Sequence, residues 1–199
     1  MPRREVKFYA GEYYHIYNRG NNRQKIFFER ENYLFFLRRV RKYLLPVGIV
    51  IVTYCLMTTH YHLMVGIKQT SEVSETSEVS EVSTGMMRLS VSYTKAINKR
   101  YQRVGVLFQG PFQAVHVDRN EYLLHLSRYM HLNPVTAGLV ERPEDWEFSS
   151  YREYIGLRNG TLPEPEIVLS QFPTRNAYQE FVASYSKGDQ ELIAHLLLD

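Results

Sequence analysis

The sequence predicts an α+β protein in which an antiparallel sheet carries helices on one face and continues into a C-terminal helical extension. Two observations support this fold class. Segments with the apolar patterns typical of strands lie at residues 12–18, 47–57, 60–67 and 112–118. Segments with helical apolar periodicity separate them at residues 31–45 and 85–103. The resulting order is strand, helix, strand, strand, helix, strand, which is the ferredoxin-like βαββαβ arrangement.

Each element follows from a local pattern. Residues 12–18 alternate between two faces as a strand does, and residues 19–22 have the composition of a turn. In residues 31–45, apolar side chains recur every three or four positions, as they do on the buried face of a helix. Only Thr58 and Thr59 separate the second and third strands, so we expect these two strands to form a hairpin.

The region after the fourth strand predicts further helices. Residues 121–132 carry a helical pattern, and Pro134 or Gly138 is expected to end or bend that helix. Short helices are expected at 176–185 and 190–198.

These patterns divide the chain into two parts. We expect one domain at residues 1–140 and a helical extension at 141–199 that packs on it. Within the domain, residues 70–84 form an acidic segment of low complexity, built from Ser-Glu-Val and Ser-Glu-Thr triplets. A period of three matches neither a strand nor a helix, so this segment predicts a loop.

The composition restricts the compartment and the partners. The single cysteine, Cys55, excludes an internal disulfide and a cysteine-based zinc site. No segment resembles a signal peptide, and no apolar run reaches the roughly 18 residues of a membrane span, so we expect a cytoplasmic protein with no membrane partner. The net charge of +3 becomes +7 when the four glutamates of the acidic segment are set aside. Such charge suits a polyanion, although solvated surface charge is an equally good interpretation of each basic cluster.

Two histidines form a candidate metal site. His60 and His62 are separated by one residue in a predicted strand, so their imidazoles point to the same face. Such a pair can hold a divalent metal, although it also occurs in strands that bind nothing.

A second candidate pair lies on the helix predicted at 121–132 and just after it. Tyr129 and Asn133 are four residues apart, so they stand one above the other on a helix. An amide oxygen could complete a metal site with His60 and His62, and Mg²⁺ or Mn²⁺ suits that mixed set best. The phenol could then attack a phosphate. Tyr122 is a poorer candidate because it would lie about 16 Å along the helix from Asn133. Ordinary half-burial of Tyr129 and a simple helix end at Asn133 are the alternatives.

Several segments together resemble the single-tyrosine HUH transposases, in particular the REP-associated tyrosine transposases of the IS200-like family. The resemblance is carried by residues 14–23, 54–63, 85–100, 107–110 and, most specifically, by 128–140. The family usually has Pro-Asn before its first motif histidine, where this chain has Thr58 and Thr59.

The resemblance implies a role for each candidate residue. It implies that His60, His62 and Asn133 bind the metal and that Tyr129 is the nucleophile. It also implies a substrate of hairpin-bearing single-stranded DNA, a 5′-phosphotyrosine product, and a bacterial protein that associates with the nucleoid when bound to DNA.

Basic residues are the candidates for contact with the DNA backbone; they are Arg19, Arg23, Lys99 and Arg100. Two other functions stay open at this point: a hairpin DNA- or RNA-binding protein without catalysis, and a metal-dependent hydrolase of small phosphoesters. The sequence also leaves open whether the protein acts as a monomer or as a homodimer with helices exchanged between chains.

Overall fold

A computed structural model describes residues 6–69 and 81–197 of the chain. Four strands form one sheet, and they are β1 (Tyr13–Arg19), β2 (Ile49–Leu56), β3 (His60–Ile67) and β4 (Gln113–Val117). The longer helices are α1 (Arg30–Tyr43), α2 (Glu81–Arg100) and α3 (Asn120–Thr136). Shorter helices follow at α4 (Tyr151–Tyr154), α5 (Glu166–Leu169), α6 (Arg175–Ala183) and α7 (Lys187–Leu192).

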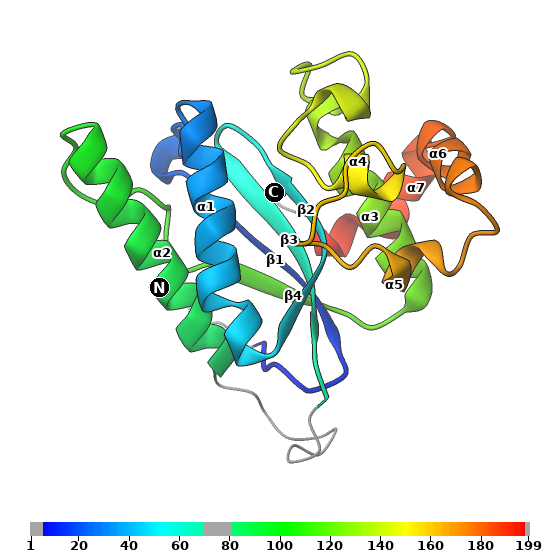
Figure 1. The fold of residues 1–199 in the computed structure, drawn as a ribbon, viewed down its shortest axis with the longest axis horizontal. Helices are drawn as coiled ribbons and strands as arrows, with labels where there is room; N and C mark the ends of the chain where they lie inside the picture. The colour runs from blue at the N-terminus through cyan, green and yellow to red at the C-terminus, as the bar shows by residue number, and fades with distance from the viewer. Residues whose placement is uncertain (1–5, 70–80, 198–199) are drawn as a thin grey trace.

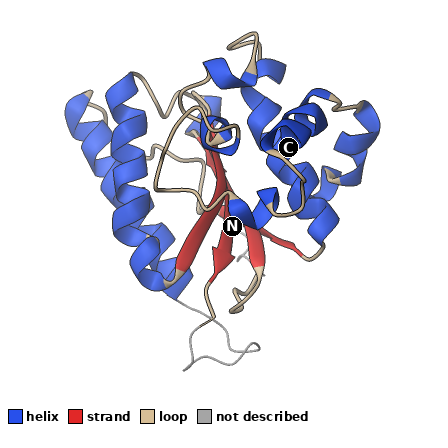
Figure 2. Cartoon of the chain, turned by 45° about the vertical axis from the view of Figure 1, so that its right-hand side comes forward, coloured by secondary structure: helices blue, strands red, loops and turns tan. Residues whose placement is uncertain are grey.

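The sheet has the predicted ferredoxin-like topology. Its strand order is β2-β3-β1-β4, and each neighbouring pair is antiparallel. The predicted α+β fold class is therefore confirmed. The two crossover helices α1 and α2 lie together on one face, while α3 and the later helices lie on the other (Figures 1 and 2).

Covering both faces of the sheet produces two hydrophobic cores. One core joins α1 and α2 to the sheet, with Phe36 and Tyr93 fully buried at its centre. The other joins α3 and the C-terminal helices to the sheet, with Leu126, Met130 and Tyr178 fully buried. Every residue of β2 is buried, which explains its continuous apolar sequence.

The close approach of α1 and α2 depends on Gly85. A Cβ atom at this position would lie 2.7 Å from the carbonyl oxygen of Tyr43 and 3.2 Å from Val47 Cγ2. We expect Gly85→Ala to lower the free energy of unfolding in urea by about 1–3 kcal/mol, because overpacking against backbone outweighs the gain in helix propensity. Gly188→Ala is the matched control: it is also helical, its Cβ would lie 3.7 Å from the nearest atom, and we expect no loss of stability. Equal stability of the two variants would contradict the proposed close packing.

Several predicted boundaries were wrong. Helix α2 begins at Glu81, so residues 81–84 of the expected acidic loop are helical, with Val82 fully buried against the core. Residues 70–80 of that loop lie outside the described residues. Helix α3 continues through Pro134 to Thr136, and Gly138, with a φ of +66°, follows its end. The extension contains α4 and α5, which had not been predicted, and the helix expected at 190–198 is instead α7 followed by a short 3-10 turn.

The segment after α3 covers the outer edge of β2. The backbone N–H of Leu56 donates to Phe148 at 2.9 Å, that of Ser150 donates to Tyr54 at 3.0 Å, and that of Glu164 donates to Ile51 at 2.8 Å. These bonds satisfy backbone groups that an edge strand would otherwise expose. Whether residues 141–199 form a unit separate from residues 1–140 stays a prediction.

Candidate active site

Strand β3 presents His60 and His62 on the face that α3 covers. Their ring centroids are 5.0 Å apart and their planes nearly perpendicular, at 88°. His62 is fully buried in the middle of the sheet, opposite Tyr17 on β1 and Cys55 on β2. His60, the first residue of β3, is half-buried. The two imidazoles therefore form the expected pair on one face.

The turn before His60 is held by backbone contacts. The carbonyl of Thr58 accepts from Ile26 N–H at 2.9 Å, and the carbonyl of Thr59 accepts from Gly20 N–H at 2.8 Å. In addition, Met57 N–H donates to the His60 carbonyl at 2.9 Å. The Thr58–Thr59 turn is thus anchored to the segment that follows β1.

Both histidines are held in the neutral form. Burial lowers the pKa of His60 to about 4, and the nearby charge of Arg19 acts in the same direction. Burial also lowers the pKa of His62 well below its usual 6.5, with smaller effects from His15 and His60. Since a neutral imidazole has a free lone pair, each ring is in the state that a metal requires.

Helix α3 places Tyr129 against this pair. The ring of Tyr129 lies 6.1 Å from that of His62, edge to face at 85°. Asn133 follows one turn further along α3, beside Tyr129 on the same side of the helix. Burial raises the pKa of the Tyr129 phenol above its usual 10.0, although the neighbouring Asn133 side chain has a smaller effect in the opposite direction. Strand β3 and helix α3 thus bring all four residues to one place.

Tyr122 lies elsewhere. Its ring is 4.9 Å from that of His195 and 5.2 Å from the guanidinium carbon of Arg119. Neither His195 nor Arg119 belongs to the group formed by His60, His62, Tyr129 and Asn133. This agrees with the separation along the helix that the sequence predicts between Tyr122 and Asn133.

Two polar atoms at the meeting point of β3 and α3 are buried without a hydrogen-bond partner within the described chain: His62 Nε2 and Asn133 Nδ2. Unsatisfied buried groups cost free energy, and a bound ligand is one explanation for them. Within residues 6–69 and 81–197, no three His, Cys, Asp or Glu side chains form a metal-binding group. A divalent metal would therefore need the amide oxygen of Asn133 with His60 and His62, and this set of donors fits Mg²⁺ or Mn²⁺.

His15 is a site residue that the sequence did not identify. It is fully buried, its Nε2 lies 2.9 Å from His62 Nδ1, and its Nδ1 lies 2.6 Å from the carbonyl oxygen of Leu196. The ferredoxin-like order places β1 beside β3, which could have drawn attention to a histidine on β1. The register, however, decides which face it occupies, and the sequence does not give the register.

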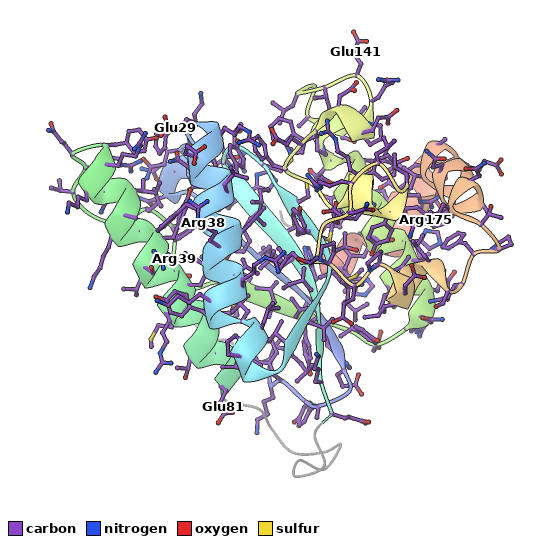
Figure 3. All side chains as sticks on the ribbon, in the orientation of Figure 1. Glu29, Arg38, Arg39, Glu81, Glu141 and Arg175 are labelled. Atoms are coloured by element: carbon purple, nitrogen blue, oxygen red, sulfur yellow. The ribbon has the colours of Figure 1, made fainter. Side chains whose placement is uncertain are left out.

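The basic candidates gather at the end of the sheet where β3 begins. Arg19 pairs with His60 in the strand register, and exposed Arg23 lies in the short 3-10 turn beyond β1. Lys99 and Arg100 are exposed at the end of α2. Arg100 forms a 2.5 Å ion pair with Glu29, which lies at the upper end of α1 in Figure 3. DNA contact by these residues stays a prediction.

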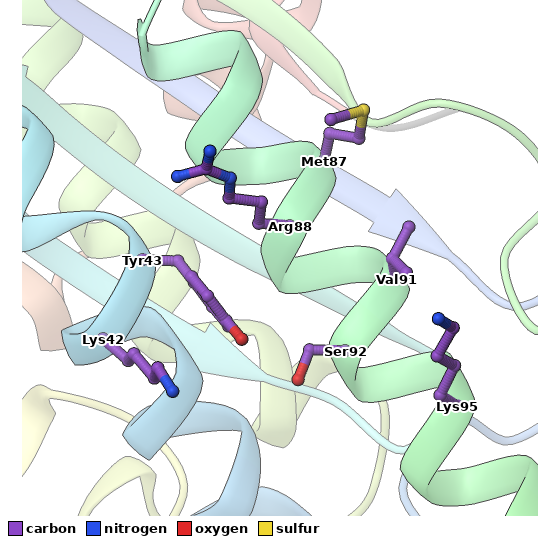
Figure 4. Close-up of a pocket in the computed structure, with 7 residues that line it drawn as sticks. All are labelled: Lys42, Tyr43, Met87, Arg88, Val91, Ser92 and Lys95. Atoms are coloured by element: carbon purple, nitrogen blue, oxygen red, sulfur yellow. The ribbon is translucent and has the colours of Figure 1, made fainter.

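A separate pocket lies between the outer faces of α1 and α2 (Figure 4). Its volume is about 570 Å³, and it is lined by Lys42, Tyr43 and Met87, by Arg88, Val91 and Ser92, and by Lys95. Because α1 and α2 cover the opposite face of the sheet from α3, this pocket is separate from the group formed by His60, His62, Tyr129 and Asn133.

None of the helices in the described residues is both long and apolar enough to cross a membrane.

The chain resembles known proteins in sequence pattern and in fold. The sequence model of a family described as transposase IS200 like matches residues 9–133, more than half of the chain. A solved REP-associated tyrosine transposase bound to a REP hairpin is similar in fold, with a TM-score of 0.61 at 15% identity, covering 82% of this chain and 97% of that one. A candidate transposase from Deinococcus radiodurans R1 has a TM-score of 0.40 at 15% identity, covering 65% of this chain and 94% of that one. No curated protein matches the sequence. The chain therefore belongs to the IS200-like transposase family.

Proposed function

We propose that the protein is a metal-dependent endonuclease and strand transferase that acts on hairpin-bearing single-stranded DNA. The observation that carries the proposal is the position of Tyr129, whose ring lies 6.1 Å from that of His62 and which stands one helical turn before Asn133 on α3. The proposed nucleophile and the three proposed metal ligands would thus share one site. The hairpin substrate is supported by the similar transposase, which was solved with a REP hairpin.

The proposed reaction exchanges one phosphoester for another. The phenolic oxygen of Tyr129 attacks the phosphorus atom, the bond to the 3′-oxygen breaks, and a 3′-hydroxyl leaves. The phenol loses one proton and the leaving oxygen gains one, so the step is balanced. The resulting 5′-phosphotyrosine keeps the energy of the broken bond for rejoining, which hydrolysis by water would lose.

The side chains of the site would have separate roles in this reaction. A divalent metal held by His60, His62 and Asn133 would neutralise charge that develops on the phosphate oxygens. Since none of these ligands is anionic, the full positive charge would act on the substrate. Burial keeps the Tyr129 phenol protonated until substrate arrives. Arg19, Arg23, Lys99 and Arg100 would contact the DNA backbone beside His60. We place this activity in a bacterial cytoplasm.

An end-labelling experiment tests the proposal. A pool of single strands with randomised hairpin stems and flanks is incubated with the protein and Mn²⁺ or Mg²⁺, then run on a denaturing gel. We expect the 3′-labelled strand to migrate with the protein and the 5′-labelled fragment to be released with an extendable 3′-hydroxyl. Chelation with EDTA should abolish both products.

The other functions give different results in the same experiment. A hydrolase releases both labelled fragments and leaves none on the protein. A binding protein without catalysis retards the pool on a native gel and cuts nothing. Attachment of the 5′-labelled fragment to the protein would show the opposite polarity of cleavage. Each of these outcomes contradicts the proposed function.

A further inference from the structure

Three groups on different segments form a hydrogen-bonded chain behind the candidate metal site. The carbonyl oxygen of Leu196 lies 2.6 Å from His15 Nδ1, and His15 Nε2 lies 2.9 Å from His62 Nδ1. This series of hydrogen bonds ends at His62 Nε2, which is buried without a hydrogen-bond partner in the described part of the molecule. It therefore runs from the C-terminal extension, through β1, to a proposed metal ligand on β3.

The donor and the acceptor of each hydrogen bond can be assigned by starting from the carbonyl oxygen of Leu196. A carbonyl oxygen can only accept, so His15 Nδ1 must carry the hydrogen. His15 is fully buried, and burial disfavours a doubly protonated ring, so its Nε2 has a lone pair and accepts. His62 Nδ1 must then donate. A neutral His62 that donates from Nδ1 has no hydrogen on Nε2, and that atom is left with a free lone pair.

Ring packing fixes the orientation of the two imidazoles. The centroids of His15 and His62 are 5.1 Å apart, and their planes are inclined by only 20°. Tyr17 packs against both, at 4.9 Å from His15 and 6.3 Å from His62. With its Nδ1 edge held toward His15, His62 turns its Nε2 edge away from β1.

We propose that His15 is a positioning residue that holds His62 in the Nδ1-protonated tautomer and so prepares its Nε2 lone pair for the metal. This inference rests on the proposed function, since it assigns a purpose to the free lone pair. Outer partners of this kind fix ligand orientation in other metal sites, and their loss commonly costs about 10–100-fold in metal affinity.

A second buried histidine shows what an ordinary structural role looks like in this protein. His131 is also fully buried, but its Nδ1 lies 2.8 Å from the hydroxyl of Tyr178 and its Nε2 lies 3.0 Å from that of Ser150. Both ring nitrogens of His131 are therefore satisfied within the fold. His62 differs because its Nε2 has no hydrogen-bond partner in the described part of the molecule.

Two substitutions separate the two bonds of His15. Asparagine places an amide N–H where Nδ1 stood, so His15→Asn keeps the bond to Leu196 and loses the one to His62. Glutamine places its oxygen where Nε2 stood, so His15→Gln keeps an acceptor for His62 and loses the bond to Leu196. We expect His15→Asn to weaken Mn²⁺ binding, titrated without DNA, by about 10–100-fold. We expect His15→Gln to stay within about threefold of the wild type.

Two further measurements and one control variant make the result decisive. Thermal unfolding gives the stability of each variant, and Thr53→Val, which removes a buried hydroxyl bonded to Tyr154 at 2.6 Å, is the control for stability loss alone. Metal affinities that follow stability across all variants, or a larger loss in His15→Gln than in His15→Asn, would overturn the proposal. Nitrogen NMR of the metal-free imidazoles should show His15 and His62 protonated at Nδ1; an Nε2-protonated His62 would also overturn it.

The experiment distinguishes this inference from the proposed function. If the wild type binds no Mn²⁺, the metal chemistry and the positioning role both fail, while the NMR result still decides whether His15 sets the tautomer. If the wild type binds Mn²⁺ and His62 has the other tautomer, only the inference about His15 fails.

Discussion

Tyr129→Phe is expected to abolish the covalent protein–DNA adduct while leaving hairpin binding within about twofold of the wild type. Phenylalanine keeps the ring that packs beside His62 and removes only the attacking oxygen. Loss of a covalent nucleophile commonly lowers turnover by a factor of about 10³ or more, because the other groups cannot act without it. Adduct formation on a denaturing gel and retardation on a native gel measure the two properties separately.

Tyr122→Phe is the control for this result. Tyr122 lies on the same helix, packs against His195, and belongs to a different part of the surface. We expect it to form the adduct at the wild-type rate. Loss of the adduct in Tyr122→Phe with retention in Tyr129→Phe would show that Tyr122, and not Tyr129, is the nucleophile.

His60→Ala is expected to remove both Mn²⁺ binding and adduct formation at every metal concentration. Loss of a direct ligand should cost more than the roughly 10–100-fold seen when an outer partner is lost. His60 is half-buried at the start of β3, so its truncation should leave the fold intact. Metal titration and the adduct assay should therefore fail together, while thermal unfolding stays close to that of the wild type.

His116→Ala is the matched control. His116 lies on β4 of the same sheet and its Nε2 is 2.7 Å from a carboxylate oxygen of Glu12, in an exposed pair that contributes little to stability. We expect normal metal binding and normal adduct formation. Rescue of His60→Ala by excess Mn²⁺ would show that His60 assists the metal site without being an essential ligand.

The topology could be predicted because its signals are local. A continuous apolar run, a two-residue turn and a second apolar run predicted the hairpin of β2 and β3, and the strand order followed from the ferredoxin-like pattern. The end of α3 was predicted too early. Pro134 lacks a backbone N–H, yet the helix accommodates it, and bonds from Ala137, Gly138 and Leu139 to the carbonyls of the preceding turn close the end.

The candidate site was predicted only in part. His60, His62, Tyr129 and Asn133 each belong to a short pattern with a fixed spacing, so they could be found along the sequence. His15 and Leu196 are 181 residues apart and meet only because the extension folds back over α3 and β1. No periodicity encodes such a contact, and the face that His15 occupies depends on the β1–β3 register.

The covered edge of β2 restricts how two copies of this chain could assemble. Backbone groups of Ile51, Tyr54 and Leu56 are already occupied by the segment that follows α3. An incoming strand would have to displace that segment before it could extend the sheet on this side. Any continuous intermolecular sheet would instead have to grow from β4, at the other end of the strand order.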